Sequence, residues 1–250
     1  MSTVLGIDLG TQSVKVVFYD FLARETVAVE SAPLDLYQTE VGVAEQQAHW
    51  WVNALRQALQ QVGKGVRQSV AAIGVSGQQH GFVPLDKAGE VLAPVKLWCD
   101  TSTGAECDAI MDAFGGYDAC IEEVGNPILP GYTASKVRWF RDKHPGPYGQ
   151  MDGILLPHDY LNFYLTGERC MEAGDASGTG FLDIRTRSWS EKMLAAIDPD
   201  RDLRECLPDV RLENGPIGEL LPSIAKELAL PPGVPVSIGG GDNMMGALGT

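Results

Sequence analysis

The chain has 250 residues, which is enough for one large domain or two modest ones. Apolar residues make up 44% of it and charged residues 21%, a composition typical of a globular protein in water. The formal net charge is −14, which argues against a nucleic-acid backbone as the main partner. No apolar run approaches the roughly 20 residues of a membrane span, and the first residues lack a signal-peptide pattern. We therefore expect neither nucleic acid nor a membrane as a partner.

The five cysteines are widely spread, at Cys99, Cys107, Cys120, Cys170 and Cys206. None of them forms a Cys-x-x-Cys motif or a Cys/His spacing suited to a metal. We therefore expect reduced thiols in a cytoplasmic protein.

The first 76 residues alternate between strand-like and helix-like patterns. Apolar or β-branched runs predict strands at Val4–Leu9, Val14–Tyr19, Glu25–Ala32 and Val70–Ser76. The first two flank a short polar link and so predict a β-hairpin. Between the third and fourth, Glu45–Val62 carries apolar residues at helical spacing. The order is β-β-β-α-β, and the helical crossover should make the fourth strand parallel to an earlier one.

Shorter patterns follow along the rest of the chain. Helices are predicted at Thr103–Phe114, Ala134–Lys143, Asp159–Leu165, Ser190–Ile197 and Ile224–Leu228. Extended segments are predicted at Phe82–Asp86, Val95–Trp98, Ile154–Pro157 and Val234–Ile238. Residues 99–180 are rich in loops, with a polar turn at Asp175–Gly180, and we interpret them as an insertion beside the main sheet. The fold class is α/β, with a mixed five-stranded sheet and flanking helices.

Two polar clusters directly follow buried strands, where open α/β sheets bind ligands. In the first, Gln79 and His80 lie in the segment Gly77–Gly81; His80 could be a surface turn residue or could hydrogen-bond a sugar hydroxyl. In the second, Asp242 follows three glycines and could be a helix cap or a general base. Three glycines exceed what a cap requires, which slightly favours the base. The other histidines are interpreted as structural or surface residues.

Two further candidates have simpler alternatives. Trp98 and Asp100 could recognise a sugar through a ring face and a carboxylate, or could be a core residue beside a turn. Asp8 stands beside the polar link Gly10–Ser13 and could cap the hairpin, the interpretation that the local pattern favours. Alternatively the loop amides could meet a phosphate, with Mg²⁺ between that phosphate and Asp8. The specific phosphate motif GxxxxGK[ST] is absent from the chain.

Taken together, eight segments resemble the FGGY carbohydrate kinases in order and spacing, over residues 4–250. They are GIDLGTQSVKVVFYD, SGQQHG, VPLD, LWCD, VGNPILPGYTASKVRW, LLPHDYLNFYLTGE, DASGTGFLDI and GGGDNMMGALG. The resemblance implies a ribonuclease-H-like lobe of the actin/hexokinase superfamily. Residues 1–250 would be the N-terminal, sugar-binding domain, and a C-terminal ATP-binding lobe would lie beyond this chain.

The resemblance also implies roles for individual residues. Asp242 would be the catalytic base, and Asp8 would lie near Mg²⁺ and the γ-phosphate of ATP. The phosphate loop would comprise Gly10, Thr11 and Gln12, and the sugar contacts would include Gln79, His80 and Asn243. The implied activity is ATP-dependent phosphorylation of a ketopentose, D-xylulose above all, and the lobe alone should be inactive.

Two departures from the family pattern loosen the choice of sugar. Many relatives carry Met where this chain has Gln79, and Arg where it has the segment Thr101–Thr103. A kinase for another ketose or polyol is therefore an alternative, as is a non-catalytic, actin-like sugar-binding module. A homodimer is a further expectation.

Overall fold

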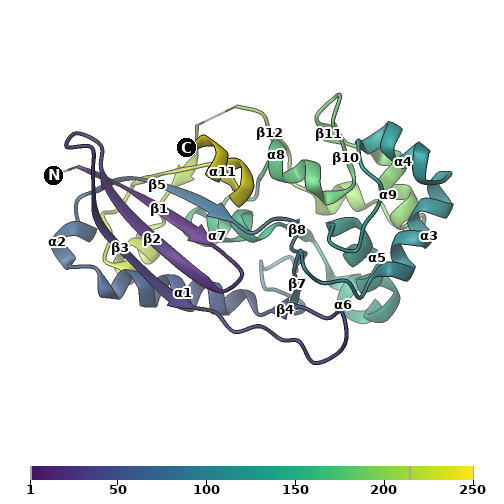
Figure 1. Ribbon diagram of the computed structural model, residues 1–250, viewed down its shortest axis with the longest axis horizontal. Helices are drawn as coiled ribbons and strands as arrows, with labels where there is room; N and C mark the ends of the chain where they lie inside the picture. Colours follow the sequence, from purple (N-terminus) through teal and green to yellow (C-terminus); the bar gives the residue numbers. More distant parts are fainter. Residues whose placement is uncertain (1, 214, 250) are drawn as a thin grey trace.

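The computed structural model describes residues 2–213 and 215–249. Within these residues the main sheet has seven strands (Figure 1): β1 (Thr3–Leu9), β2 (Ser13–Asp20), β3 (Glu25–Pro33), β5 (Val70–Gly77), β13 (Pro216–Glu219), β14 (Pro235–Ser237) and β15 (Gly240–Gly241). Six of them lie in the order β13-β14-β5-β1-β2-β3, and β15 also pairs with β5. The β1–β2 and β2–β3 pairs are antiparallel, whereas β5 is parallel to β1. The predicted β-β-β-α-β order is confirmed.

The sheet has more strands than the five expected. The segment predicted as one strand, Val234–Ile238, is continued by β15 after a break at Gly239, whose φ is +67°. A Cβ at Gly239 would overlap the carbonyl oxygen of Val75, so the close approach of this segment to β5 requires glycine. The strand β13 contains Pro216 and Gly218, residues that weaken the strand pattern in the sequence.

Helix α1 (Ala48–Gln61) covers one face of the sheet (Figure 1). Its apolar stripe is buried, at Ala48, Trp51, Val52, Leu55 and Leu59. In β1, Leu5, Ile7 and Leu9 are buried, while the residues between them are more exposed, as alternation in a strand requires. The opposite face holds Gly6 and Gly74, and helix α11 (Asp242–Leu248) reaches it through Met245.

A second hydrophobic core lies beside the sheet, at the right of Figure 1. It is built mainly from α3 (Gly104–Phe114), α4 (Tyr117–Val124), α5 (Thr133–Lys143), α6 (Pro145–Gln150) and α9 (Glu191–Ile197). Its buried residues run from Phe82 to Leu207, so the core includes much of the segment 99–180. The domain boundaries drawn from the sequence stay a prediction.

The remaining elements are short. The strands are β4 (Glu45–Gln46), β6 (Val83–Leu85), β7 (Val95–Lys96), β8 (Gly153–Leu155), β9 (Met171–Glu172), β10 (Leu182–Asp183), β11 (Ser188–Trp189) and β12 (Val210–Arg211). The helices are α2 (Lys64–Arg67), α7 (Pro157–Thr166), α8 (Ala173–Ala176), α10 (Pro222–Leu228) and the 3₁₀ turns Ser177–Thr179 and Leu203–Cys206. None of the helices in the described ranges is long and apolar enough to cross a membrane.

Two local expectations were wrong. The helix expected from Glu45 begins at Ala48, because Glu45 and Gln46 pair with β7. The segment Asp175–Gly180, expected as a polar turn, is largely helical, and Glu172 caps α8 by accepting from the backbone N–H of Asp175. Helix α6, which the sequence pattern did not indicate, begins at Pro145, a position that suits its missing N–H.

Candidate active site

Six of the residues singled out in the sequence line one cavity of about 340 Å³: Thr11, Gln79, His80, Trp98, Asp242 and Asn243. They come from four separate segments of the chain. Strands β5 and β15 are parallel, and Gly77 pairs with Gly241, so the segments that follow both strands leave the sheet at the same edge. The fold therefore assembles the two strand-end clusters into one site.

Asp242 is the first residue of α11 and is partly exposed to the cavity. Its Oδ1 accepts from the backbone N–H of Asn243 over 2.8 Å. Burial raises the pKa of the Asp242 carboxyl above its ordinary value, and the negative charges of Asp175 and Asp8 raise it further. A carboxylate with a raised pKa is a better proton acceptor, which suits a general base.

His80 is held in an unusual backbone conformation, with φ at +62°. Lys136 Nζ donates to the carbonyl oxygen of His80 over 2.8 Å and to that of Gly131 over 2.7 Å. The imidazole stacks edge-on against Tyr132, with ring centroids 5.1 Å apart. Burial lowers the pKa of His80, so the ring is neutral at pH 7 and can both donate and accept a hydrogen bond.

Thr11 joins the hairpin turn to the opposite side of the cavity. Its Oγ1 accepts from Trp98 Nε1 over 3.0 Å and donates to Gln78 Oε1 over 3.1 Å. Gln78 is buried and donates through Nε2 to Gln46 Oε1, and Gln46 Nε2 donates back to the carbonyl oxygen of Thr11. This closed network fixes the Thr11 hydroxyl and the indole of Trp98 beside the cavity.

Asp8 lies in a neighbouring cavity of about 240 Å³, together with Gly239 and Met245. Its side chain is 44% exposed, and Lys15 Nζ lies 3.8 Å from its Oδ2. An exposed carboxylate with one distant partner is free to bind a divalent cation, and oxygen is the ligand that Mg²⁺ prefers. The negative charge of Asp8 contributes to the raised pKa of Asp242. Gly10 and Gln12 are in the turn with Thr11 but do not line the larger cavity.

The structure does not bring Asp100 into the cavity. Its carboxylate is fully buried and accepts from Lys96 Nζ over 3.1 Å, from the backbone N–H of Ala44 over 2.9 Å and from Ser102. Burial raises the pKa of Asp100, but these partners outweigh it and lower the pKa overall. The expected sugar contact is therefore corrected: Asp100 is a structural partner of the buried Lys96, and only Trp98 of that pair faces the site.

Several residues near the site were not identified in the sequence. Gln78 directly precedes the predicted site residues Gln79 and His80, and Lys136 lies within the predicted helix Ala134–Lys143. Gly178 lies beside His80, where a Cβ would overlap the imidazole. The sequence signals that could have found Lys136 and Gly178 are a lysine among apolar helix residues and a glycine within the segment 175–180.

Comparison with known proteins identifies the family of this chain. The family described as "FGGY family of carbohydrate kinases, N-terminal domain" matches residues 3–249. A xylulose kinase of Haemophilus influenzae is 43% identical over 98% of this chain and 51% of its own length, and one of Escherichia coli is 38% identical over 98% and 49%. A crystal structure of xylulose kinase from Rhodospirillum rubrum matches with a TM-score of 0.90 and 26% identity, over 98% of this chain and 51% of that one.

The fold is thus that of a sugar kinase lobe from the actin/hexokinase superfamily. The chain belongs to the FGGY family of carbohydrate kinases, in the part that forms their N-terminal domain. It spans about half the length of the curated relatives that it matches.

Proposed function

We propose that this chain forms the sugar-binding half of an ATP-dependent kinase that phosphorylates a ketopentose, D-xylulose in the first instance. The observation that carries the proposal is the position of Asp242, whose carboxylate has a raised pKa and shares one polar cavity with His80, Gln79 and Asn243. The choice of sugar rests on the relatives named xylulose kinase, at 43% and 38% identity.

In this proposal Asp242 accepts the proton of the attacking sugar hydroxyl. The hydroxyl oxygen then forms a bond to the γ-phosphorus of ATP while the bond to the bridging oxygen breaks and ADP leaves. His80, Gln79 and Asn243 orient the sugar, and Trp98 covers one of its apolar faces. Little else is required of the protein, since phosphoryl transfer depends mainly on alignment and charge neutralisation.

Thr11, with its neighbours Gly10 and Gln12, is the proposed contact to the phosphates of ATP. The exposed carboxylate of Asp8 would hold Mg²⁺, directly or through water, and the ion would neutralise charge on the transferring phosphoryl group. An ATP-binding lobe in the other half of the protein is part of the proposal, so kinase activity belongs to the full-length protein.

A panel of ketoses and polyols, assayed for sugar-dependent ADP release with the full-length protein, tests the proposal. D-xylulose should give the highest kcat/KM. A better substrate elsewhere in the panel would replace the sugar but keep the kinase, whereas sugar binding without ADP release would favour the non-catalytic module.

The role of Asp242 is tested by Asp242→Asn, which should lower kcat by about a thousandfold or more while sugar binding survives. Asp112, an exposed residue of α3, offers the matched control Asp112→Asn, which should leave kcat unchanged. Equal turnover by the Asp242 variant and the control would overturn the assignment of the base.

A further inference from the structure

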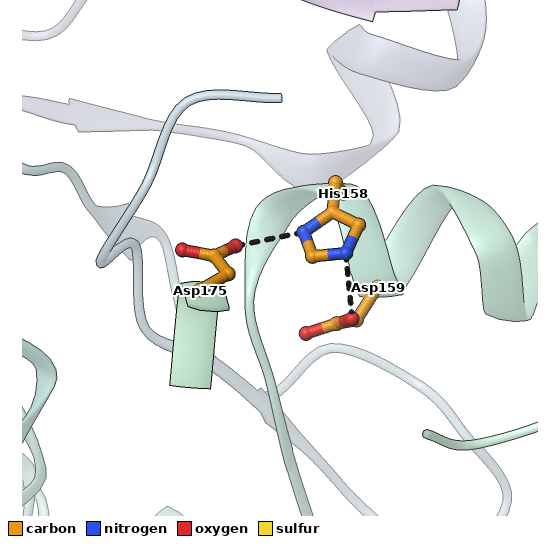
Figure 2. Close-up of side chains that lie close together, drawn as sticks. All are labelled: His158, Asp159 and Asp175. Atoms are coloured by element: carbon orange, nitrogen blue, oxygen red, sulfur yellow. Dashed lines mark hydrogen bonds and ion pairs between the residues drawn. The ribbon is translucent and has the colours of Figure 1, made fainter. Parts of the chain in front are cut away.

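A buried charged cluster lies directly behind the candidate site. His158 and Asp159 are in the first turn of α7, Asp175 is in α8, and all three are fully buried. Figure 2 shows the imidazole between the two carboxylates. His158 Nδ1 lies 2.7 Å from Asp175 Oδ2, and Nε2 lies 3.0 Å from Asp159 Oδ1.

The geometry fits a protonated imidazole better than a metal site. The ligand atoms of the three residues lie within 4.8 Å of one another, a spacing that a metal ion could use. The two ring nitrogens, however, face different carboxylates (Figure 2), so only one nitrogen could bind an ion placed in the cluster. A protonated ring instead donates from Nδ1 to Asp175 and has Asp159 at ion-pair distance from Nε2.

The charges around His158 favour that protonated form. Burial lowers the pKa of His158, but Asp159, Asp175 and, at longer range, Glu172 outweigh burial and raise the pKa to about 9. The ring therefore favours its protonated form, and burial also raises the pKa of its partner Asp159, to about 7.

A chain of hydrogen bonds leads from this cluster to the candidate site. Asp175 Oδ1 accepts from Gln79 Nε2 over 3.4 Å, a long hydrogen bond. Gln79 Oε1 accepts from Asn243 Nδ2 over 2.9 Å, and Asn243 is the neighbour of Asp242. A carboxylate accepts hydrogen bonds and cannot donate them, so Asp175 turns the NH₂ group of Gln79 towards itself. The oxygen of Gln79 then faces Asn243 and selects its NH₂ group as the donor.

Two glycines make this chain sterically feasible. Gly77 and Gly241 are paired on the neighbouring strands β5 and β15. A Cβ at Gly77 would lie 2.9 Å from the Cβ of His158, and one at Gly241 would lie 2.6 Å from Nε2 of Gln79. The backbone at both positions is therefore packed directly against the network.

We propose that His158, Asp159 and Asp175 act as a buried anchor that fixes the amide of Gln79 and, through it, Asn243. The anchor makes Asn243 donate towards Gln79 and leaves its Oδ1 as the atom able to accept from a sugar hydroxyl. The proposal rests on the proposed sugar-kinase function and deepens it. Asp175 and His158 are positioning residues, because they reach the sugar through Gln79; the charge of Asp175 also acts on the carboxyl of Asp242.

The test is a double-mutant cycle in the full-length protein, with Asp175→Asn, Gln79→Met and the double variant. Each single change should raise the KM for the ketopentose about tenfold, as expected for loss of a hydrogen bond to a charged group. KM is the readout, because removing the charge of Asp175 also acts on the base Asp242 and so on kcat. In the Gln79→Met background, Asp175→Asn should change KM by less than about twofold, since the link to the site is already broken.

An equal effect of Asp175→Asn in both backgrounds would overturn the proposal. Asp175→Asn also alters the buried anchor, so thermal unfolding is measured for all four proteins, and Gln79→Met provides an arm that leaves the anchor intact. A normal KM for a well-folded Gln79→Met protein would also overturn it.

Failure of the proposed function would look different. The wild-type protein would then release no ADP with any sugar. The hydrogen-bond network of Asp175 and Gln79 would still be tested by the coupling of Asp175→Asn and Gln79→Met in the free energy of unfolding. Additive effects on unfolding would overturn the network itself.

Discussion

Gly178 lies against the imidazole of His80 so closely that a Cβ at position 178 would overlap its ring atoms Cε1 and Nδ1. The two residues are far apart in the sequence, and the contact joins the end of β5 to the 3₁₀ turn Ser177–Thr179. Lys136 holds the backbone of His80 by donating to its carbonyl oxygen. Lys136 fixes the backbone of His80, and position 178 limits where its ring can lie.

Gly178→Ala should displace the imidazole and lower kcat/KM for the sugar by about tenfold or more, as expected when a site group moves by about an ångström. Steady-state kinetics with the full-length protein measure this. Gly149→Ala is the control, because that glycine is exposed in α6 with nothing near its missing Cβ. In a His80→Ala background the effect of Gly178→Ala should nearly vanish; a persistent effect would mean that the two residues are not coupled.

Asp100→Asn should destabilise the protein without changing sugar affinity in the folded fraction. Breaking a buried ion pair costs about 3–5 kcal/mol, and the remaining contact of Lys96 with Glu45 at 2.9 Å favours the lower end. Urea unfolding and calorimetry with the sugar measure the two quantities. Weaker sugar binding with unchanged stability would restore Asp100 as a sugar contact.

Thr11→Val should remove both hydrogen bonds of the Thr11 hydroxyl, so that Trp98 Nε1 and Oε1 of the buried Gln78 each lose this partner. We expect kcat/KM to fall by about tenfold, a loss of roughly 1–2 kcal/mol. Thr11→Ser retains the hydroxyl and should remain within about threefold of wild type. Trp98 is the tryptophan with the most exposed side chain, at 51%, so its fluorescence reports any change in the indole environment. Equal kinetics for the two variants would contradict the network.

The sequence predicted the parts of this structure that depend on local periodicity. The hairpin and α1 follow from apolar spacing, and the site residues Gln79 and Asp242 were identified because each directly follows a buried strand. What it could not predict are contacts set by tertiary packing. Asp100 and Asp175 are both aspartates in polar segments, yet packing buries one against Lys96 and the other against His158. Lys96 lies only four residues before Asp100, but the two pair across the turn after β7 and not along a helix, and His158 and Asp175 come from separate elements.

Lys136 provides a test of how burial controls stability. The side chain is fully buried, and burial lowers its pKa from 10.5 to about 7, while its Nζ donates to two carbonyl oxygens. A neutral amine can still donate both hydrogen bonds, so the folded protein tolerates loss of the charge.

The sign of the pH dependence follows from the lowered pKa. Below about pH 7 the amine is charged in both the folded and the unfolded protein, and the cost of burying the charge is fully present. Between about pH 7 and 10.5 the unfolded state retains a proton that the folded state has lost, so stability due to Lys136 should rise with pH. The rise is at most about 1.4 kcal/mol per pH unit.

The measurement is the free energy of unfolding of wild type minus that of Lys136→Met, from pH 6.5 to 9. The difference should increase with pH. The raised pKa of His158 makes its own stabilisation fall with pH between its ordinary value and about 9, but this contribution is common to both proteins and cancels. Lys64→Met is the control, because Lys64 is exposed in α2, and its difference should not depend on pH. A flat difference for Lys136→Met would mean that Lys136 remains charged in the folded protein throughout this range.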